Sequence, residues 1–200
     1  YRTGIVKDKI RLIVGLGNPG SEYENTRHNA GAWLLNEIAR QHGVQLKPEK
    51  KFHGISGKAQ IKGQEVFLLF PTTFMNASGQ AVQALANFYK IPVNEILVLH
   101  DELDLPTGVS KFKLGGGHGG QNGLRDIISK MGNDKNFYRL RVGIGHPGDK
   151  TKVTGHVLGK PNKDDLKKIE ASIDASASEI DSAVSGDWHG AMNRLHTFKA

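Results

Sequence analysis

Apolar residues occur along the chain in short runs or in alternation with polar residues, and both patterns predict β-strands. The run before Gly15 and the run before His100 are continuous, which is typical of strands buried on both faces. Alternation marks the segments on either side of the glycine-rich stretch around Gly117. The predicted strands are residues 10–14, 52–61, 65–71, 95–99, 109–114 and 138–144.

Segments with helical periodicity lie between and after these strands. The last is the longest, since Asn162 suits its N-terminus, Gly186 suits its end, and its apolar residues form one stripe. That stripe consists of Leu166, Ile169, Ile173, Ile180 and Val184. The other predicted helices are residues 29–42, 76–89, 124–131 and a short helix after Gly186. Because strands alternate with helices, we expect an α/β fold with a mixed β-sheet and helices on both of its faces.

No internal repeat, linker or change of composition divides the 200 residues, which suits a single compact domain. We expect this domain to cover residues 10–200, and residues 1–9 to be an N-terminal extension or a cloning remnant. The chain has no cysteine, which excludes disulfides and thiolate metal sites and suits a reducing, cytoplasmic compartment. The longest apolar run, residues 66–70, is far shorter than the roughly 20 residues that span a bilayer, so no membrane partner is expected.

The chain carries a net charge of +7, and most of this charge comes from one segment. Between residues 105 and 152, nine basic residues face three acidic ones, which gives a local net charge of +6. The basic residues are Lys111, Lys113, Arg125, Lys130, Lys135, Arg139, Arg141, Lys150 and Lys152. Such clustering is typical of a surface that contacts a polyanion, so we expect a nucleic acid as partner.

A glycine motif, GLGNPG at residues 15–20, follows the first predicted strand and has the spacing of a dinucleotide-binding turn. Such a turn needs a helix that begins inside the motif, whereas Pro19 lies there and residues 21–27 have no helical period. Nicotinamide binding is therefore disfavoured. The motif is either a plain tight turn or a turn that presents Asn18 at the carboxyl edge of the sheet.

A histidine and a carboxylate supply the candidate chemistry. His28 directly precedes a predicted helix, and Asp101 follows a buried strand that ends at the same sheet edge as Asn18. A carboxylate there can accept the imidazole N–H, set the tautomer and raise the basicity of the ring. His28 could instead lie on the surface, and Asp101 could be a turn or capping residue. The chain lacks a metal-binding histidine motif and the G-x-S-x-G motif that carries the nucleophile of many serine hydrolases. Activation of water by a histidine is therefore the simplest hydrolytic chemistry open to this chain.

Two further segments could border this edge of the sheet. Residues 71–76 (PTTFMN) lead from a strand into a helix, so Asn76 is either a helix cap or a site residue, and Met75 could form a flexible apolar wall. Residues 115–123 (GGGHGGQNG) lack the G-K-[ST] sequence of a nucleotide-binding P-loop. This glycine loop could act as a lid with Asn122 as a polar contact at its end.

Six segments together resemble the signature segments of bacterial peptidyl-tRNA hydrolases, in the same order along the chain. They are residues 15–20 (GLGNPG), 26–31 (TRHNAG), 71–79 (PTTFMNASG), 100–105 (HDELDL), 115–123 (GGGHGGQNG) and 139–148 (RLRVGIGHPG). The resemblance implies a monomeric enzyme, without metal or cofactor, that cleaves the ester between a peptide and the terminal ribose of tRNA. The expected partner is peptidyl-tRNA.

The resemblance also implies roles for individual residues. His28 is expected to be the general base, Asp101 to orient it, and Asn18 to distinguish blocked from free aminoacyl ends. The residues expected to contact the substrate are Tyr23, Phe74, Met75, Asn76 and Asn122. Lys113 and Arg141 are expected to clamp phosphate of the acceptor stem, with Lys111 as a weaker candidate.

One residue departs from the family pattern, because Gln121 stands where many members carry histidine. No catalytic role is expected at that position. Two other interpretations of the chain remain: a non-catalytic RNA-binding module, which leaves Asn18, His28 and Asp101 without a role, and a nicotinamide oxidoreductase.

Overall fold

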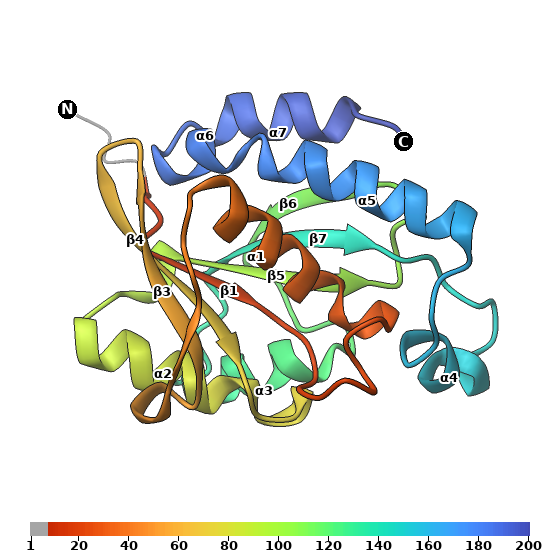
Figure 1. The fold of residues 1–200 in the computed structure, drawn as a ribbon, viewed down its shortest axis with the longest axis horizontal. Coiled ribbons are helices and arrows are strands. Elements are labelled where there is room, and N and C mark those ends of the chain that lie inside the picture. Colours follow the sequence, from red (N-terminus) through yellow and green to blue (C-terminus); the bar gives the residue numbers. More distant parts are fainter. Residues whose placement is uncertain (1–7) are drawn as a thin grey trace.

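A computed structural model describes residues 8–200, and within them seven strands form one sheet (Figure 1). The strand order is β2-β3-β4-β1-β5-β7-β6. The strands are β1 (Leu12–Gly15), β2 (Lys47–Glu49), β3 (Gly54–Ile61), β4 (Gln64–Pro71), β5 (Ile96–Glu102), β6 (Ser110–Leu114) and β7 (Tyr138–Gly143). Of the expected extension at residues 1–9, residues 1–7 lie outside the described part, while the carboxylate of Asp8 accepts hydrogen bonds from Tyr138 and Asn94.

The sheet is mixed, as the sequence predicts. Strands β4, β1, β5 and β7 run parallel in its centre, while β2, β3 and β6 pair antiparallel towards the two edges. The hairpin between β3 and β4 turns through Lys62 and Gly63, both at positive φ, as tight hairpin turns require. Because the four central strands are parallel, their carboxyl ends meet at one edge of the sheet.

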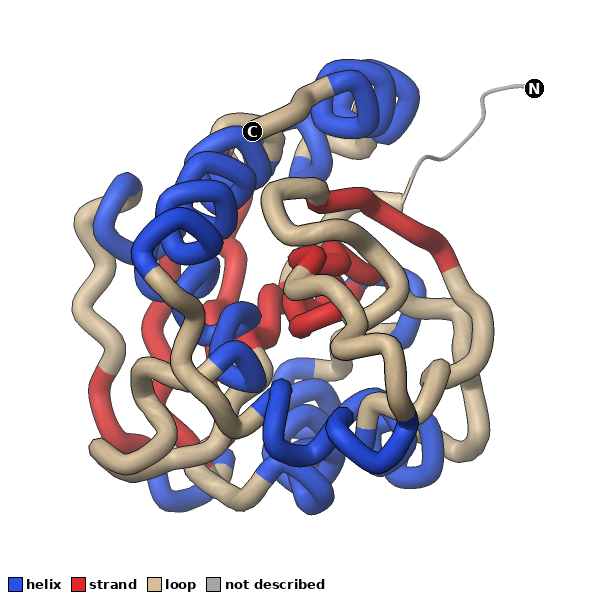
Figure 2. The backbone as a smooth tube through the Cα atoms, turned by 90° about the vertical axis from the view of Figure 1, so that its right-hand side faces the viewer, coloured by secondary structure: helices blue, strands red, loops and turns tan. Residues whose placement is uncertain are grey.

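Helices cover both faces of this sheet, which confirms the predicted α/β class (Figures 1 and 2). The helices are α1 (Ala30–Gln41), α2 (Ser78–Tyr89), α3 (Asn122–Lys130), α4 (Val153–Val157), α5 (Lys163–Ala177), α6 (Ile180–Val184) and α7 (Trp188–Thr197). Side chains of α1, α5, α6 and α7 form one apolar core with the sheet, and those of α2 and α3 form a second core on the opposite face.

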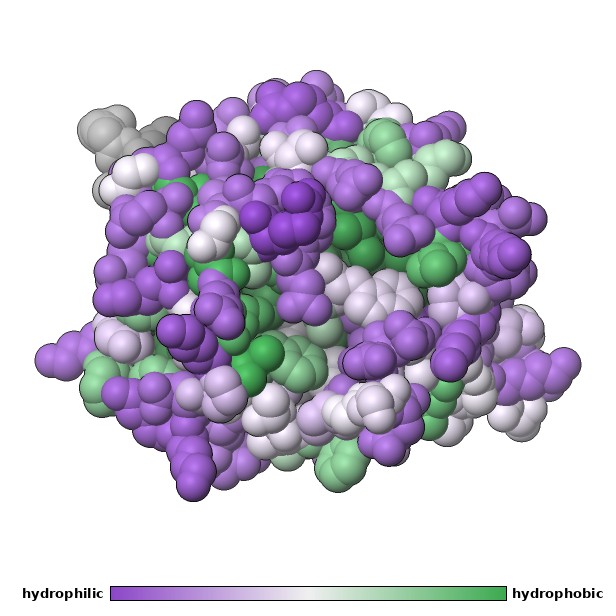
Figure 3. Space-filling model, in the orientation of Figure 1, coloured by the Kyte–Doolittle hydropathy of each residue, from purple (hydrophilic) through white to green (hydrophobic). Residues whose placement is uncertain are grey.

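Strand β5 shows how one strand serves both cores. Leu97 and Leu99 point to the core under α1, while Ile96 and Val98 point to the core under α2, and all four are buried. This two-residue period explains the continuous apolar run in the sequence. On the face seen in Figure 3, hydrophilic side chains cover most of the surface and apolar ones show mainly in the hollows between them. Among residues 8–200, no helix combines the length and the apolarity needed to cross a membrane.

The prediction of a single long C-terminal helix is wrong, because two helices occupy that part of the chain. Helix α5 ends at Ala177 and α6 begins at Ile180, with Glu179 between them in a non-helical conformation (φ −99°, ψ 0°). The carboxylate of Glu179 pairs with Arg194 of α7 at 2.8 Å, and the break lets α6 and α7 fold back together. The buried stripe itself is correct for Ile169, Ile173, Ile180 and Val184, whereas Leu166 is exposed.

Two elements have no counterpart among the predicted ones. Strand β2 contains Pro48 and is an edge strand with exposed residues, so it lacks an apolar pattern. Helix α4 follows a 3₁₀ turn at Lys150–Lys152 and has no buried residue, which explains why its periodicity is weak. Helix α4 nevertheless lies beside the candidate site described next.

Candidate functional site

The carboxyl ends of β1, β4 and β5 border a pocket of about 330 Å³. This is the position where ligand sites of open α/β sheets lie. The residues that line the pocket are Asn18, His28, Phe74, Met75, Asn76, Asp101, Glu102, Leu103, Gly119, Gly120, Gln121, Asn122, Val153, Thr154, Val157 and Leu158. The pocket therefore brings together segments from five distant parts of the chain.

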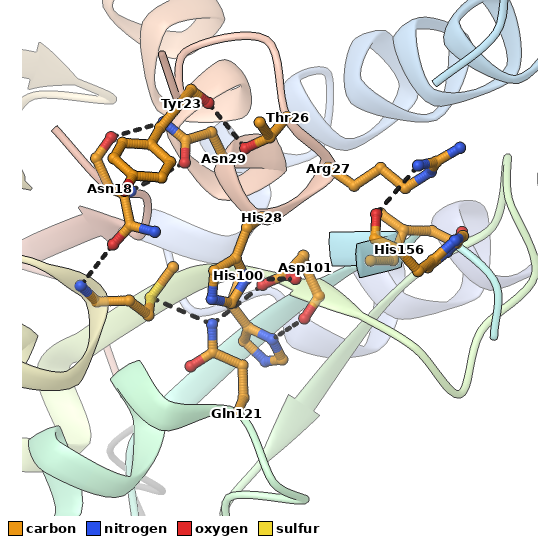
Figure 4. Close-up of polar contacts among 12 residues, drawn as sticks. Asn18, Tyr23, Thr26, Arg27, His28, Asn29, His100, Asp101, Gln121 and His156 are labelled. Carbon is orange, nitrogen blue, oxygen red and sulfur yellow. Dashed lines mark hydrogen bonds and ion pairs between the residues drawn. The ribbon is translucent and has the colours of Figure 1, made fainter. Parts of the chain in front are cut away.

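His28 and Asp101 form the polar centre of the pocket (Figure 4). Nδ1 of His28 lies 2.8 Å from Oδ2 of Asp101, and the two side chains are 13% and 3% exposed. Since a carboxylate only accepts hydrogen bonds, Nδ1 carries the proton of this contact and the neutral ring has Nε2 as its basic nitrogen. Burial alone would lower the pKa of His28, but the charge and the hydrogen bond of Asp101 raise it above its ordinary value.

A close approach of α1 to β5 makes this contact possible. His28 lies in a 3₁₀ turn, Arg27–Asn29, that leads directly into α1. Three residues after His28, a Cβ atom at Gly31 would collide with the backbone carbonyl of Leu99 in β5. Only glycine lets the first turn of α1 lie against the strand end that carries Asp101.

Asn18 is held by a network of amide hydrogen bonds. Its Oδ1 accepts from the backbone N–H of Met75 at 2.7 Å. Its own backbone N–H donates to Oδ1 of Asn29, whose Nδ2 donates back to the carbonyl of Asn18, both at 2.9 Å. Because the oxygen of the Asn18 amide faces Met75, the NH₂ group is left to donate elsewhere (Figure 4). The role of Asn29 in this network was not predicted, although it follows His28 directly in the TRHNAG segment.

The glycine motif at residues 15–20 does not open a helix. Residues 16–19 are irregular, residues 20–26 form turns and bends, and the first helical turn after β1 begins at Arg27. A Cβ atom at Gly17 would lie within 3.0 Å of three atoms of the Asn29 side chain. Gly17 thus leaves room for the side chain of Asn29, and the segment lacks the helix N-terminus that holds pyrophosphate in nicotinamide enzymes.

The segment after β4 supplies an apolar wall and one amide. Phe74 is 59% exposed on the rim, and the ring of Tyr23 packs edge-on against it at 6.1 Å between centroids. Met75 is buried. Asn76 lines the pocket from a 3₁₀ turn at Met75–Ala77 and does not cap α2, so the capping interpretation of Asn76 is wrong. Tyr23 reaches the pocket only through its contact with Phe74.

The C-terminal end of the glycine loop, residues 119–122, lines the pocket. Asn122 is the first residue of α3, and its Oδ1 accepts from Arg125 at 3.1 Å. Gln121 precedes α3 and its Nε2 donates to Oδ1 of Asp101 at 3.0 Å. This contact was not predicted, because only the tertiary structure brings residue 121 beside residue 101.

The basic residues predicted to clamp phosphate lie on β6 and β7, which flank the glycine loop in the sequence. They are not among the residues that line the pocket. Strand pairing places Lys113 opposite Arg139 and Lys111 opposite Arg141. Arg139 is buried, and its guanidinium donates to the carbonyls of Gly116 and Gly117 in the glycine loop. Burial, then the charge of Arg141, lowers the pKa of Arg139 to about 10. Arg139 therefore anchors the loop, while Lys113 and Lys111 carry exposed or half-buried charge on β6.

Comparison with known proteins gives consistent matches over the whole described domain. The sequence model of the peptidyl-tRNA hydrolase family matches residues 12–200. The chain is 61% identical over 191 residues to a peptidyl-tRNA hydrolase of Colwellia psychrerythraea, covering 96% of this chain and 98% of that relative. It is 57% identical over 195 residues to one of Vibrio vulnificus, covering 98% and 100%. A crystal structure of peptidyl-tRNA hydrolase from Acinetobacter baumannii superposes with a TM-score of 0.94 at 50% identity, covering 98% of this chain and 99% of that one.

Proposed function

The chain belongs to the peptidyl-tRNA hydrolase family, and from this premise we propose that it hydrolyses the ester between peptide and tRNA by general-base catalysis through His28. The observation that carries the proposal is the contact between His28 and Asp101, 2.8 Å long and nearly buried, at the centre of a pocket lined by amide side chains. The product is a free tRNA, released from a stalled or dropped-off translation product.

In the proposed reaction, water lies between Nε2 of His28 and the carbonyl carbon of the ester. His28 takes a proton from the water as it attacks, and the negative charge of Asp101 stabilises the imidazolium that forms. The tetrahedral intermediate then collapses, the bond to the ribose oxygen breaks, and the imidazolium returns the proton to that oxygen. The raised pKa of His28 suits both halves of this cycle, since it strengthens the base and keeps the acid available.

Asn18, Asn76 and Asn122 are proposed to bind the acyl end of the substrate. All three line the pocket around His28. Their NH₂ groups can donate to peptide carbonyls or to the oxygen that becomes negative in the tetrahedral intermediate. Asn18 is the best held of the three, and its NH₂ can bond the carbonyl of an N-acylated residue but gains nothing from a free ammonium group.

Phe74 and Met75 are proposed to contact the side chains of the peptide, and Tyr23 to hold Phe74 in place through the edge-on contact of their rings. An exposed aromatic ring and a flexible thioether suit varied apolar groups. Lys113 and Arg141, with Lys111 beside them, are proposed to hold phosphates of the acceptor stem without reading its bases. Following the resemblance to the family, we propose that the chain acts as a monomer, in the cytoplasm where its substrate arises.

The test is release of peptide from N-acetylated aminoacyl-tRNA by the purified chain, with EDTA present. We expect multiple turnovers by the native chain and a loss of turnover in His28→Ala with the affinity for tRNA retained. Binding of tRNA without ester cleavage would instead support the RNA-binding module. Saturable binding of NADH in a parallel titration would support the oxidoreductase.

A further inference from the structure

Gln121 joins two elements of the site through the two ends of its side-chain amide. Its Nε2 donates to Oδ1 of Asp101 at 3.0 Å, and its Oε1 accepts from the backbone N–H of Leu124 at 2.9 Å. The first contact reaches the end of β5 (Figure 4), and the second caps the N-terminus of α3. The amide has only one orientation that satisfies both partners, because a carboxylate only accepts and a backbone N–H only donates.

The surroundings hold Gln121 in this place. Gly119 and Gly120 turn the chain into Gln121 with φ angles of 58° and 85°. On the other side, a Cβ atom at Gly123 would lie 2.7 Å from Sδ of Met75 and 2.9 Å from Oε1 of Gln121. The first turn of α3 is therefore packed tightly against the pocket, which leaves little room for Gln121 to shift.

The contact completes the partners of Asp101. Oδ2 of Asp101 faces Nδ1 of His28, and Oδ1 faces Nε2 of Gln121, so each carboxylate oxygen has its own donor. The residue is 4% exposed, which keeps water from replacing a lost donor easily. A carboxyl group with a partner on one oxygen only can rotate about its terminal torsion, which is broad and soft.

We propose that Gln121 is a positioning residue that acts on His28 through Asp101. By fixing the plane of the Asp101 carboxylate it fixes the direction of the imidazole, and by capping α3 it keeps Asn122 in register with that pair. Because a side-chain amide does not titrate, Gln121 performs this role over the whole working pH range. The inference rests on the proposed function, in which His28 is the general base.

The competing explanation is that Gln121 does no more than cap α3. Gln121→Ser separates the two roles, because serine is a good helix cap but is too short to reach Asp101. Gln121→Asn does the same with a shorter amide, and it keeps the test valid if the serine variant folds poorly. Asp187→Ala is the matched control, because Asp187 caps α7 through the N–H of Gly190 at a distance from the pocket.

We expect Gln121→Ser and Gln121→Asn to lower kcat about tenfold, the size that corresponds to one lost hydrogen bond to a charged group, with KM for peptidyl-tRNA almost unchanged. The acid limb of kcat/KM should move to lower pH, because a loosely held Asp101 stabilises the imidazolium less. The NMR titration of the His28 ring should move in the same direction. Asp187→Ala should lower Tm and leave kcat and the pH profile as they are.

Native kcat and an unmoved acid limb in Gln121→Ser and Gln121→Asn would overturn the inference and leave only the cap. An acid limb displaced to higher pH would also overturn it, since that shift means that Asp101 kept its place and its charge became more available to His28. His28→Ala separates the two proposals. If it is inactive while the Gln121 variants are normal, only the role of Gln121 fails, whereas near-native turnover in His28→Ala removes the general base itself.

Discussion

The two sides of the pocket differ in how firmly they are held. On the side of the sheet, Asn18, Met75 and Asp101 are buried, and hydrogen bonds of 2.7 to 3.0 Å join them to their neighbours. On the opposite side, α4 contributes Val153, Thr154 and Val157 to the pocket but has no buried residue.

A few contacts attach α4 to the rest of the protein. Arg27 donates to the carbonyl of His156 from its guanidinium and to the carbonyl of Gly159 from its backbone N–H, both at 3.0 Å. Nε2 of His156 lies 3.1 Å from the carbonyl of Ile144 and 3.0 Å from that of Gly145, and it donates to them because carbonyls only accept. Segments with few buried apolar contacts open locally at low cost. The comparison indicates that the groups proposed to react are firmly held, while the wall that α4 forms is attached by fewer contacts.

Removal of the base should have the largest effect. His28→Ala takes away the only group proposed to accept the proton of water, so we expect turnover to fall by about 10²–10⁴ with affinity for tRNA within a few-fold of native. Single-turnover rates and a filter-binding assay measure the two quantities. If turnover stays near native, the firmly held side of the pocket is not where the chemistry occurs.

Asp101→Asn should have a smaller effect on turnover, because the base remains but its tautomer and direction are less well set. The raised pKa of His28 depends on the charge of Asp101, so loss of that charge should lower the pKa. In the proposed mechanism the neutral ring is the active form, so the acid limb of kcat/KM should move to lower pH. A pH–rate profile of the variant measures this shift. A shift of the acid limb to higher pH would contradict the proposed role of Asp101.

The double change Lys113→Ala with Arg141→Ala tests a contact outside both sides of the pocket. Each lost phosphate contact should reduce the slope of log K against log salt by about 0.7–0.9, so KM for peptidyl-tRNA should rise at low salt and depend less on salt. A minimal peptidyl-nucleoside ester serves as control, because it lacks the acceptor stem and its hydrolysis should not change. Equal losses on both substrates would indicate misfolding, and a native salt slope would remove the phosphate clamp.

Asn18→Ala should change selectivity more than rate. Since the NH₂ of Asn18 is proposed to bond the carbonyl of an acylated amino terminus, its loss should narrow the gap in kcat/KM between N-acylated and free aminoacyl-tRNA by about 3- to 10-fold. Competition between the two substrates measures the ratio directly. An unchanged ratio would assign the discrimination to another residue of the pocket.

The smallest effect is expected from loosening α4. His156→Leu removes the hydrogen bonds to the carbonyls of Ile144 and Gly145, so we expect KM to change about two- to threefold for peptides with large side chains, with kcat unchanged. His189→Leu, at an exposed position of α7, is the matched control. A tenfold fall in kcat would show that α4 takes part in the chemistry and would end the distinction between the two sides.

Local patterns in the sequence determined much of this picture. The apolar runs before Gly15 and His100 identify β1 and β5, and the parallel arrangement of such strands brings Asn18 and Asp101 to one edge because side chains after parallel strands share that edge. The alternation near Arg139 and Arg141 identifies β7 in the same way. These features depend on the spacing of apolar residues within a short segment, which can be recognised without knowledge of the rest of the chain.

Other features depended on contacts between residues far apart in the chain, and only the tertiary structure decided them. His28 and Asp101 are separated by 73 positions, and their contact depends on the absence of a side chain at Gly31. At the break before Ile180, Glu179 pairs with Arg194 of α7. Arg139 belongs to the basic cluster of the sequence, but it is buried and donates to the carbonyls of the glycine loop. Gln121 acquires its partner only when α3 packs beside β5. Sequence periodicity records which face of an element is buried, but not which polar atom meets another across the fold, because that depends on packing between elements.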